Sequence, residues 1–311
     1  MNFKGFLEGL GAREAPLSLS NLYILSGMSK REMEAFRGVW PRLPVERRRG
    51  ILRALAEITE ASFEADFNSI LRFCLSDEDE EVRAQAIEGL WEDESISILR
   101  SLIGLLRGDP SSLVRAKAAA GLGRFVLLAE LDELDNELGA EVRELLLRTI
   151  NNPQELLEVR RRAVEAISFS GEEGVRKIIE TAYQDEAQKM RVSALFAMGR
   201  SVDPYWGKTL LRELKNPDPE MRHEAARACG ELELKEALPT LARLVNDADR
   251  EVQGATIWAL GQIGGQRARR LLRACCESDD EIVAKAADEA LSELEFAEGI
   301  FEIPIYGEEE E

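Results

Sequence analysis

Residues Asn216 to Leu232 read NPDPEMRHEAARACGEL, and this stretch combines a turn, a helix start and an amphipathic helix with small residues on one face. Similar stretches precede and follow it, and an apolar residue recurs in them at a constant interval of 31 residues. Its positions are Met190, Met221, Val252 and Val283. A fixed period of this length indicates a repeat protein in which each short unit packs on its neighbours.

Seven clear copies of this helix can be aligned, and each begins near an apolar anchor. The anchors are Val82, Val114, Val159, Met190, Met221, Val252 and Val283. A small residue stands four places after each anchor, as Ala86, Ala118, Ala163, Ala194, Ala225, Thr256 and Ala287. These two columns lie on one helical face, where small side chains let neighbouring helices approach closely. The pattern predicts an all-α protein, a right-handed α–α superhelix of about eight helical hairpins.

The pattern weakens at three places, which divide the chain. Residues 1–20 are weakly patterned and are expected to be a flexible N-terminal segment, while repeats are expected over 21–297. The first repeat is degenerate, and Ser29 with Glu32 forms a capping-box pattern at its start. One interval between anchors is 45 residues, so we expect an insertion near 125–138, which is either tolerated or a functional loop.

Residues 298–311 are expected to form an acidic C-terminal tail. An apolar run around Pro304 is followed there by four glutamates. The run could cap the last helix, bind a partner as a peptide or added strand, or remain disordered.

A repeated pair of charges accompanies the turns and helices. Acidic residues stand in the turns at Asp77, Asp109, Asp185 and Asp247, and arginine follows the anchor at Arg83, Arg115, Arg191 and Arg222. We expect these side chains to form a structural ladder of ion pairs between adjacent repeats.

Composition excludes several broad classes of function. The 311-residue chain has a formal net charge of −19, which disfavours general binding to nucleic acid or to anionic membranes. No run of 18 apolar residues occurs, so no membrane span is expected. The four cysteines (Cys74, Cys229, Cys275 and Cys276) contain no CxxC pair, which suits free thiols in a reducing cytoplasm.

Four segments carry a family resemblance over roughly residues 45 to 295. They are DEDEEVRAQAIEGL (77–90), DPSSLVRAKAAAGLG (109–123), DPEMRHEAARACGEL (218–232) and DREVQGATIWALGQIG (249–264). They resemble the HEAT repeat, and more closely its short bacterial form, first noted in phycobilisome lyases. The resemblance implies an armadillo/HEAT-type solenoid, but arrays of this kind serve as scaffolds, lyase subunits, a hydroxylase and DNA glycosylases, so it does not decide the function.

The resemblance includes the hydroxylase that acts on deoxyhypusine, which holds two irons through several His-Glu pairs. Here Arg222-His223-Glu224 matches that motif once, and His223 is the only histidine in the chain. One pair cannot supply the several ligands of such a centre, so this activity is not expected and His223 is interpreted as an exposed helix residue. No nucleophile for a lyase and no continuous basic face for a glycosylase can be identified.

An unusual group of side chains stands on the helix face expected to line the inner side of the array. It consists of Phe196, His223, Arg227 and Trp258. Aromatic residues around an arginine are typical of interaction sites, although curvature of the array could instead bury Phe196 and Trp258. Trp91, at the end of its helix, is expected to be packed.

The sequence therefore predicts a non-catalytic, cytoplasmic scaffold or adaptor that binds a protein or peptide and carries no cofactor, metal or catalytic residues. The alternative is an accessory subunit of a cofactor-attaching or protein-modifying enzyme. The partner and the oligomeric state are not determined by these patterns.

Overall fold

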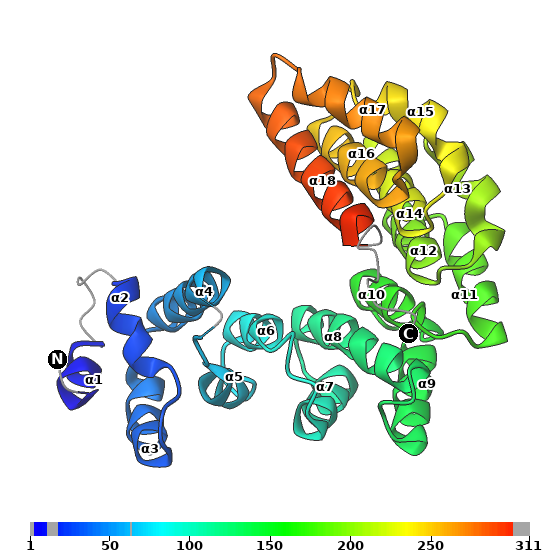
Figure 1. Ribbon diagram of the computed structural model, residues 1–311. Coiled ribbons are helices and arrows are strands. Elements are labelled where there is room, and N and C mark those ends of the chain that lie inside the picture. Colours follow the sequence, from blue (N-terminus) through cyan, green and yellow to red (C-terminus); the bar gives the residue numbers. More distant parts are fainter. Residues whose placement is uncertain (1–2, 11–17, 63, 301–311) are drawn as a thin grey trace, which may run out of the picture. The chain divides into compact units, whose positions relative to one another are not determined.

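A computed structural model describes residues 3–10, 18–62 and 64–300 of the chain, and over this range it contains eighteen α-helices, four short 3-10 helices and no strand (Figure 1). The prediction of an all-α fold built from helical hairpins is confirmed. The chain divides into two compact units, Met1–Ile167 and Ser168–Glu311, which are described separately. None of the described helices is both long enough and apolar enough to cross a membrane.

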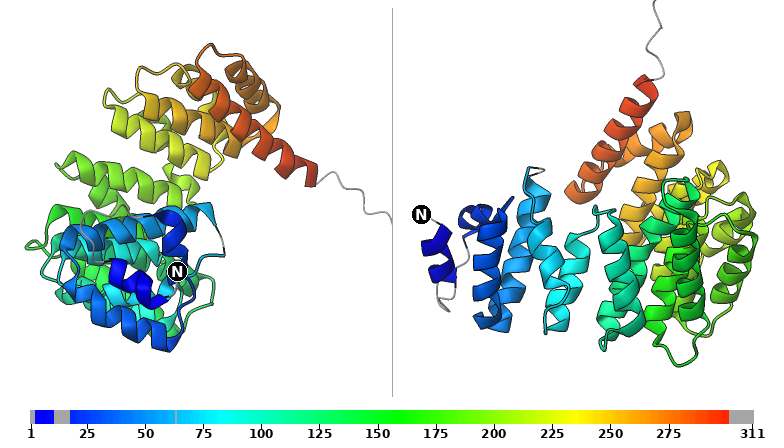
Figure 2. Two further views of the ribbon diagram at one scale, coloured as in Figure 1. Left: turned by 90° about the vertical axis from the view of Figure 1, so that its left-hand side faces the viewer. Right: turned by 90° about the horizontal axis from the view of Figure 1, so that it is seen from below.

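The first unit begins with α1 (Phe3–Leu10), α2 (Leu19–Leu22) and η1 (Tyr23–Leu25) and continues as four hairpins. The hairpins are α3 (Lys30–Val39) with η2 (Trp40–Arg42) and α4 (Val45–Ala61), α5 (Asn68–Cys74) with α6 (Glu80–Gly89), α7 (Ile96–Gly108) with α8 (Ser112–Glu130), and α9 (Asn136–Ile150) with α10 (Leu157–Ile167). The second helices α4, α6, α8 and α10 pack on one another in this order. Figure 2 shows the helices from α3 to α8, blue to green, following one another in a row.

The second unit contains four further hairpins. They are α11 (Glu173–Tyr183) with α12 (Gln188–Arg200), η3 (Pro204–Trp206) and α13 (Gly207–Glu213) with α14 (Pro219–Glu231), η4 (Lys235–Ala237) and α15 (Leu238–Leu244) with α16 (Arg250–Ile263), and α17 (Gly265–Cys276) with α18 (Glu281–Ile300). Helices α12, α14, α16 and α18 again pack in sequence order.

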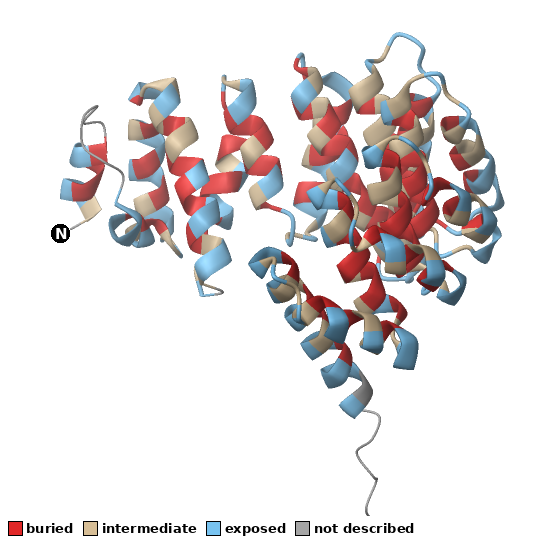
Figure 3. Ribbon diagram, turned by 90° about the horizontal axis from the view of Figure 1, so that it is seen from above, coloured by how far each residue is buried: buried red, intermediate tan, exposed pale blue. Residues whose placement is uncertain are grey.

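The small-residue column explains why these second helices lie so close together. All seven members, from Ala86 to Ala287, are completely buried. Glycines allow an even closer approach: a Cβ atom on Gly199 would lie 2.9 Å from the Cα atom of Ala228, and one on Gly230 would lie 2.9 Å from the Cα atom of Ala259. Figure 3 shows the buried residues, in red, along the helix faces turned toward neighbouring helices.

Several helices begin directly after a polar residue whose side chain caps them. Ser29 and Glu32 form the predicted capping box, which is confirmed. Asp79, Asp218 and Asp249 accept hydrogen bonds from backbone N–H groups in the first turns of α6, α14 and α16. These aspartates satisfy N–H groups that have no partner within the helix.

Two of the predicted boundaries differ from the structure. Residues 3–10, expected to be flexible, form α1 with Phe6, Leu7 and Leu10 buried, because its apolar residues lie on one face. The expected tail begins inside α18, which continues to Ile300, and residues 301–311 lie outside the described part of the chain.

Most of the extra residues between Val114 and Val159 are helical. Helices α8 and α9 have 19 and 15 residues, and a short turn at 131–135 joins them. The insertion therefore lengthens the second helix of one hairpin and the first helix of the next. Gly139 near the start of α9 packs so closely that a Cβ atom there would lie 2.8 Å from the Cβ atom of Ala129.

Candidate functional site

Arginines at the start of the second helices connect neighbouring repeats. Arg83 donates two hydrogen bonds of 2.8 Å to the carboxylate of Asp109 in the next turn, and its Nη1 donates to the backbone carbonyls of Asp77 and Glu78 in its own turn. Arg222 does the same with Asp247, at 2.9 and 2.7 Å, and with the carbonyls of Asn216 and Pro217. One guanidinium therefore joins a helix, its turn and the following turn.

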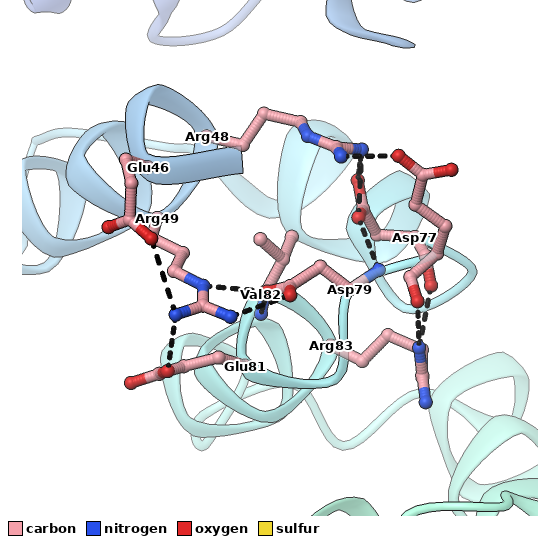
Figure 4. A network of polar contacts seen from close by, with 9 residues as sticks. Glu46, Arg48, Arg49, Asp77, Asp79, Glu81, Val82 and Arg83 are labelled. Atoms are coloured by element: carbon pink, nitrogen blue, oxygen red, sulfur yellow. Dashed lines mark hydrogen bonds and ion pairs between the residues drawn. The ribbon is translucent and has the colours of Figure 1, made fainter. Parts of the chain in front are cut away.

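The first repeat contributes the same contact through a residue that the sequence pattern did not single out. Arg48 Nη1 lies 2.9 Å from both carboxylate oxygens of Asp77, and both side chains are buried (Figure 4). Trp40 Nε1 donates to the same carboxylate, so Asp77 is shared between an arginine and an indole. Arg49 pairs in parallel with Asp79 at 2.9 and 2.7 Å.

Such hydrogen bonds lower the pKa of carboxylates that accept them, as at Asp247 and Glu155. The bond from Arg222 holds the pKa of Asp247 below its ordinary value, because the cation favours the charged carboxylate. Arg115 lowers the pKa of Glu155 in the same way.

Two of the expected ladder arginines deviate from the expected aspartate pairing. Arg115 pairs with Glu155 at 2.9 and 2.8 Å rather than with an aspartate, because the turn between α9 and α10 presents this glutamate to it. Arg191 donates to the carbonyls of Asp185 and Glu186 in its own turn, but the next turn presents the uncharged Asn216 where other repeats have an acid. Asp185 itself accepts from the backbone N–H of Ala187.

The four candidate binding residues lie on three adjacent helices. Phe196 stands on α12, His223 and Arg227 on α14, and Trp258 on α16, and all four are half-buried. We call the surface formed by these four residues the α12–α16 face. Its residues come together because α12 packs on α14 and α14 on α16.

Stacking contacts fix the aromatic side chains of this face. The guanidinium of Arg227 lies 4.5 Å from the ring centroid of Trp258, and the guanidinium of Arg200 lies 5.4 Å from that of Phe196. The Trp258 ring occupies space that the absent side chain of Gly230 leaves open. The sequence left open whether Phe196 and Trp258 are packed or exposed. In the structure each ring is partly buried and partly accessible.

His223 is not an isolated exposed residue. Its Nδ1 atom lies 3.4 Å from Oε1 of Glu224, and both side chains are half-buried.

A two-iron centre of the kind that the hydroxylase resemblance implies does not fit these residues. Such a centre needs several imidazole and carboxylate ligands that converge. The chain has one histidine, and no group of three or more His, Cys, Asp or Glu side chains among the described residues is placed to hold a metal ion.

The cysteines are free thiols. Cys74 and Cys229 are buried, and burial raises the pKa of Cys229 to about 12. Desolvation also raises the pKa of Cys275 and of its neighbour Cys276. High pKa values keep thiols protonated near neutral pH, where they are poor nucleophiles.

The structure exposes one aromatic residue that was expected to be packed. Trp91, just after α6, has 64% of its surface accessible. It borders a hollow of about 400 Å³ lined by residues of α4, α5 and α6, among them Leu52, Leu55 and Leu71. The sequence pattern missed this hollow because it arises between two repeats rather than within one.

Comparison with known proteins identifies the repeat type. The family of HEAT repeats matches residues 67–138 and 207–292, which together make up just over half of the chain. Deoxyhypusine hydroxylase-B of Oryza sativa subsp. japonica is 25% identical over 230 residues, covering 68% of this chain and 76% of that protein. Deoxyhypusine hydroxylase of Cryptococcus neoformans is 28% identical over 135 residues, covering 42% of this chain and 37% of that protein.

Among solved structures, the complex of CpcE and CpcF of phycocyanin lyase from Nostoc is similar in fold. It has a TM-score of 0.55 and 16% sequence identity, and the match covers 91% of this chain and 97% of that chain. This likeness supports the bacterial HEAT-like repeat architecture.

The two curated relatives correct the predicted function. Both are enzymes, so the prediction of a non-catalytic scaffold, and with it the prediction that the chain is no enzyme, is wrong. The prediction failed because repeat columns report how helices pack, and they carry no information about chemistry on the packed array.

Proposed function

The chain belongs to the HEAT-repeat family, and from this premise we propose that it acts on another protein, a segment of which it holds against the α12–α16 face. The observation that carries this proposal is the stack of Arg227 on Trp258 at 4.5 Å, beside Phe196 on the next helix. Arginine and aromatic residues are enriched among side chains that contribute most to binding energy.

The α12–α16 face is suited to binding because its side chains are already ordered. Arg227 is fixed over Trp258, and Trp258 is fixed against Gly230. A surface whose side chains are ordered before binding loses less conformational entropy when a ligand arrives.

The charge of the chain supports a basic polypeptide as the ligand. The net charge is −19, and α14 contributes Glu220 and Glu224 next to His223. We therefore propose a segment in which lysine or arginine lies near an apolar side chain: the cation faces the carboxylates, and the apolar group contacts Trp258 and Phe196.

The curated relatives support an enzymatic outcome of this binding. Both are named for hydroxylation of deoxyhypusine. We propose that the bound protein is a substrate whose covalent state changes, and we derive no step through a two-iron centre because the residues present do not fit one.

Photo-crosslinking tests both parts of the proposal. A photoreactive phenylalanine analogue replaces Phe196 in one sample and the exposed Tyr205 on η3 in a control sample. We expect the label at position 196 to capture a protein that the label at 205 does not. Peptide mass spectrometry should then find, near the cross-link, a modification that depends on incubation with the wild-type chain.

A double variant provides the matched test of the surface. Phe196→Ala with Trp258→Ala should lower affinity for the captured protein, while Tyr205→Ala with Ile282→Ala, two exposed residues elsewhere in the same unit, should not. Equal binding by both folded variants would refute the α12–α16 face as the site. Binding without any covalent change would refute the enzymatic part alone.

A further inference from the structure

A groove on the first unit carries positive charge in a strongly acidic protein. It lies between α3 and α5, has a volume of about 440 Å³, and is lined by Met28, Lys30, Met33, Glu34, Arg37, Ser69, Arg72 and Phe73. We call it the α3–α5 groove. Three of its residues are cationic and one is acidic, whereas the whole chain has a formal charge of −19.

The groove combines an apolar surface with available cations. Met33 is buried, Met28 and Phe73 are half-buried, and methionine side chains adapt readily to apolar ligands. The guanidinium of Arg37 lies 5.5 Å from the ring centroid of Phe73. Arg72 is paired with Asp93, while Lys30 and Arg37 are exposed and make no ion pair with the carboxylates of the described residues.

A ligand complementary to this groove combines apolar side chains with negative charge. One stretch of this chain has that composition: residues 301–311 read FEIPIYGEEEE, with Phe301, Ile303, Ile305 and Tyr306 before four consecutive glutamates. The apolar residues suit Met28, Met33 and Phe73, and the glutamates suit Lys30 and Arg37.

We propose that the α3–α5 groove binds residues 301–311 of a second copy of this chain. The contact links residues 301–311 of one molecule to the first unit of another, and it uses none of the residues of the α12–α16 face.

A labelled synthetic peptide tests the recognition. The peptide FEIPIYGEEEE carries fluorescein, and its anisotropy is followed as the full-length chain is added. We expect saturable binding that weakens as ionic strength rises, because salt screens exposed charges. A scrambled peptide of the same composition, and one with every Glu changed to Gln, should bind more weakly.

Charge-reversal variants locate the site. Lys30→Glu with Arg37→Glu should weaken peptide binding about tenfold or more, since two exposed attractions between opposite charges are replaced by repulsion. Lys215→Glu with Lys235→Glu changes the net charge equally at exposed positions in the second unit and should leave binding unchanged. Equal loss in both variants, or no binding by the wild type, would overturn the proposal.

Sedimentation velocity tests the second copy. The full-length chain should associate with increasing concentration, and the Lys30/Arg37 variant and a chain ending at residue 300 should not. A full-length chain that remains monomeric at every concentration would refute a contact between copies, whatever the result for the α12–α16 face.

Discussion

Arg222 shows how much one side chain can do in this fold. Its guanidinium binds the carboxylate of Asp247 and two backbone carbonyls of its own turn, and both charged side chains are largely shielded from water. If the arginine is removed, the shielded carboxylate still bears the cost of desolvation without a cation to offset it. Removing one partner therefore costs more free energy than forming the pair gains.

We therefore expect Arg222→Ala to destabilise the protein by about 2–3 kcal/mol. Arg191→Ala is the matched control, because Arg191 binds the same kind of turn carbonyls but meets Asn216 at the position where Arg222 meets Asp247. Urea denaturation should show a larger loss of unfolding free energy for Arg222→Ala than for Arg191→Ala. Equal losses would mean that the carbonyl contacts, rather than the ion pair, dominate.

The same pair predicts a pH dependence. The pKa of Asp247 is depressed in the folded state, so its contribution is fully present above the unfolded pKa of about 3.9 and is lost as pH falls through the lower folded value. The stability difference between wild type and Asp247→Asn should therefore shrink below about pH 4. Urea midpoints measured across this range would contradict the idea if the difference stayed constant.

At the scale of the helix, glycine decides how closely α14 and α16 approach. A Cβ atom on Gly230 would lie 2.7 Å from the Trp258 ring and 2.9 Å from the Cα atom of Ala259, so no rotation of a side chain relieves the second contact. Gly254, in the middle of α16, faces open space. Gly230 therefore lies at the contact between α14 and α16, whereas Gly254 does not.

Gly230→Ala should destabilise the protein by about 1–3 kcal/mol because it forces the helices apart. Gly254→Ala should stabilise it by about 0.5–1 kcal/mol, since alanine restricts the unfolded chain and is the better helix former. Thermal unfolding of both variants gives opposite shifts in Tm if this is right. A shift in the same direction for both would show that α14 and α16 adjust freely.

For the whole molecule, the central question is whether side chains from different repeats converge on a metal. A two-iron centre needs several ligands from several helices, and the chain offers one histidine. We expect the chain purified after anaerobic incubation with Fe(II) to hold no two-iron centre, and His223→Ala to leave its iron content unchanged. Metal analysis and Mössbauer spectra that show two coupled irons per chain would contradict this expectation.

Part of the candidate site followed from the repeat period. Arg227 and Trp258 are 31 residues apart, so they occupy nearby positions in successive repeats, and their stacking extends the pattern that aligned the anchors. Their partial burial did not follow, because it depends on Gly230 opposite the ring. The binding role of Phe196, His223, Arg227 and Trp258 stays a prediction.

The sequence by itself determined the helical repeat, its anchors and its buried small-residue column, because these features are local and recur at a constant interval. Only the tertiary structure decided which groups meet between repeats. It paired Arg115 with Glu155, left Trp91 exposed and placed Lys30 and Arg37 beside Phe73. Such contacts depend on helix lengths and on how neighbouring hairpins stack, and no single repeat encodes them.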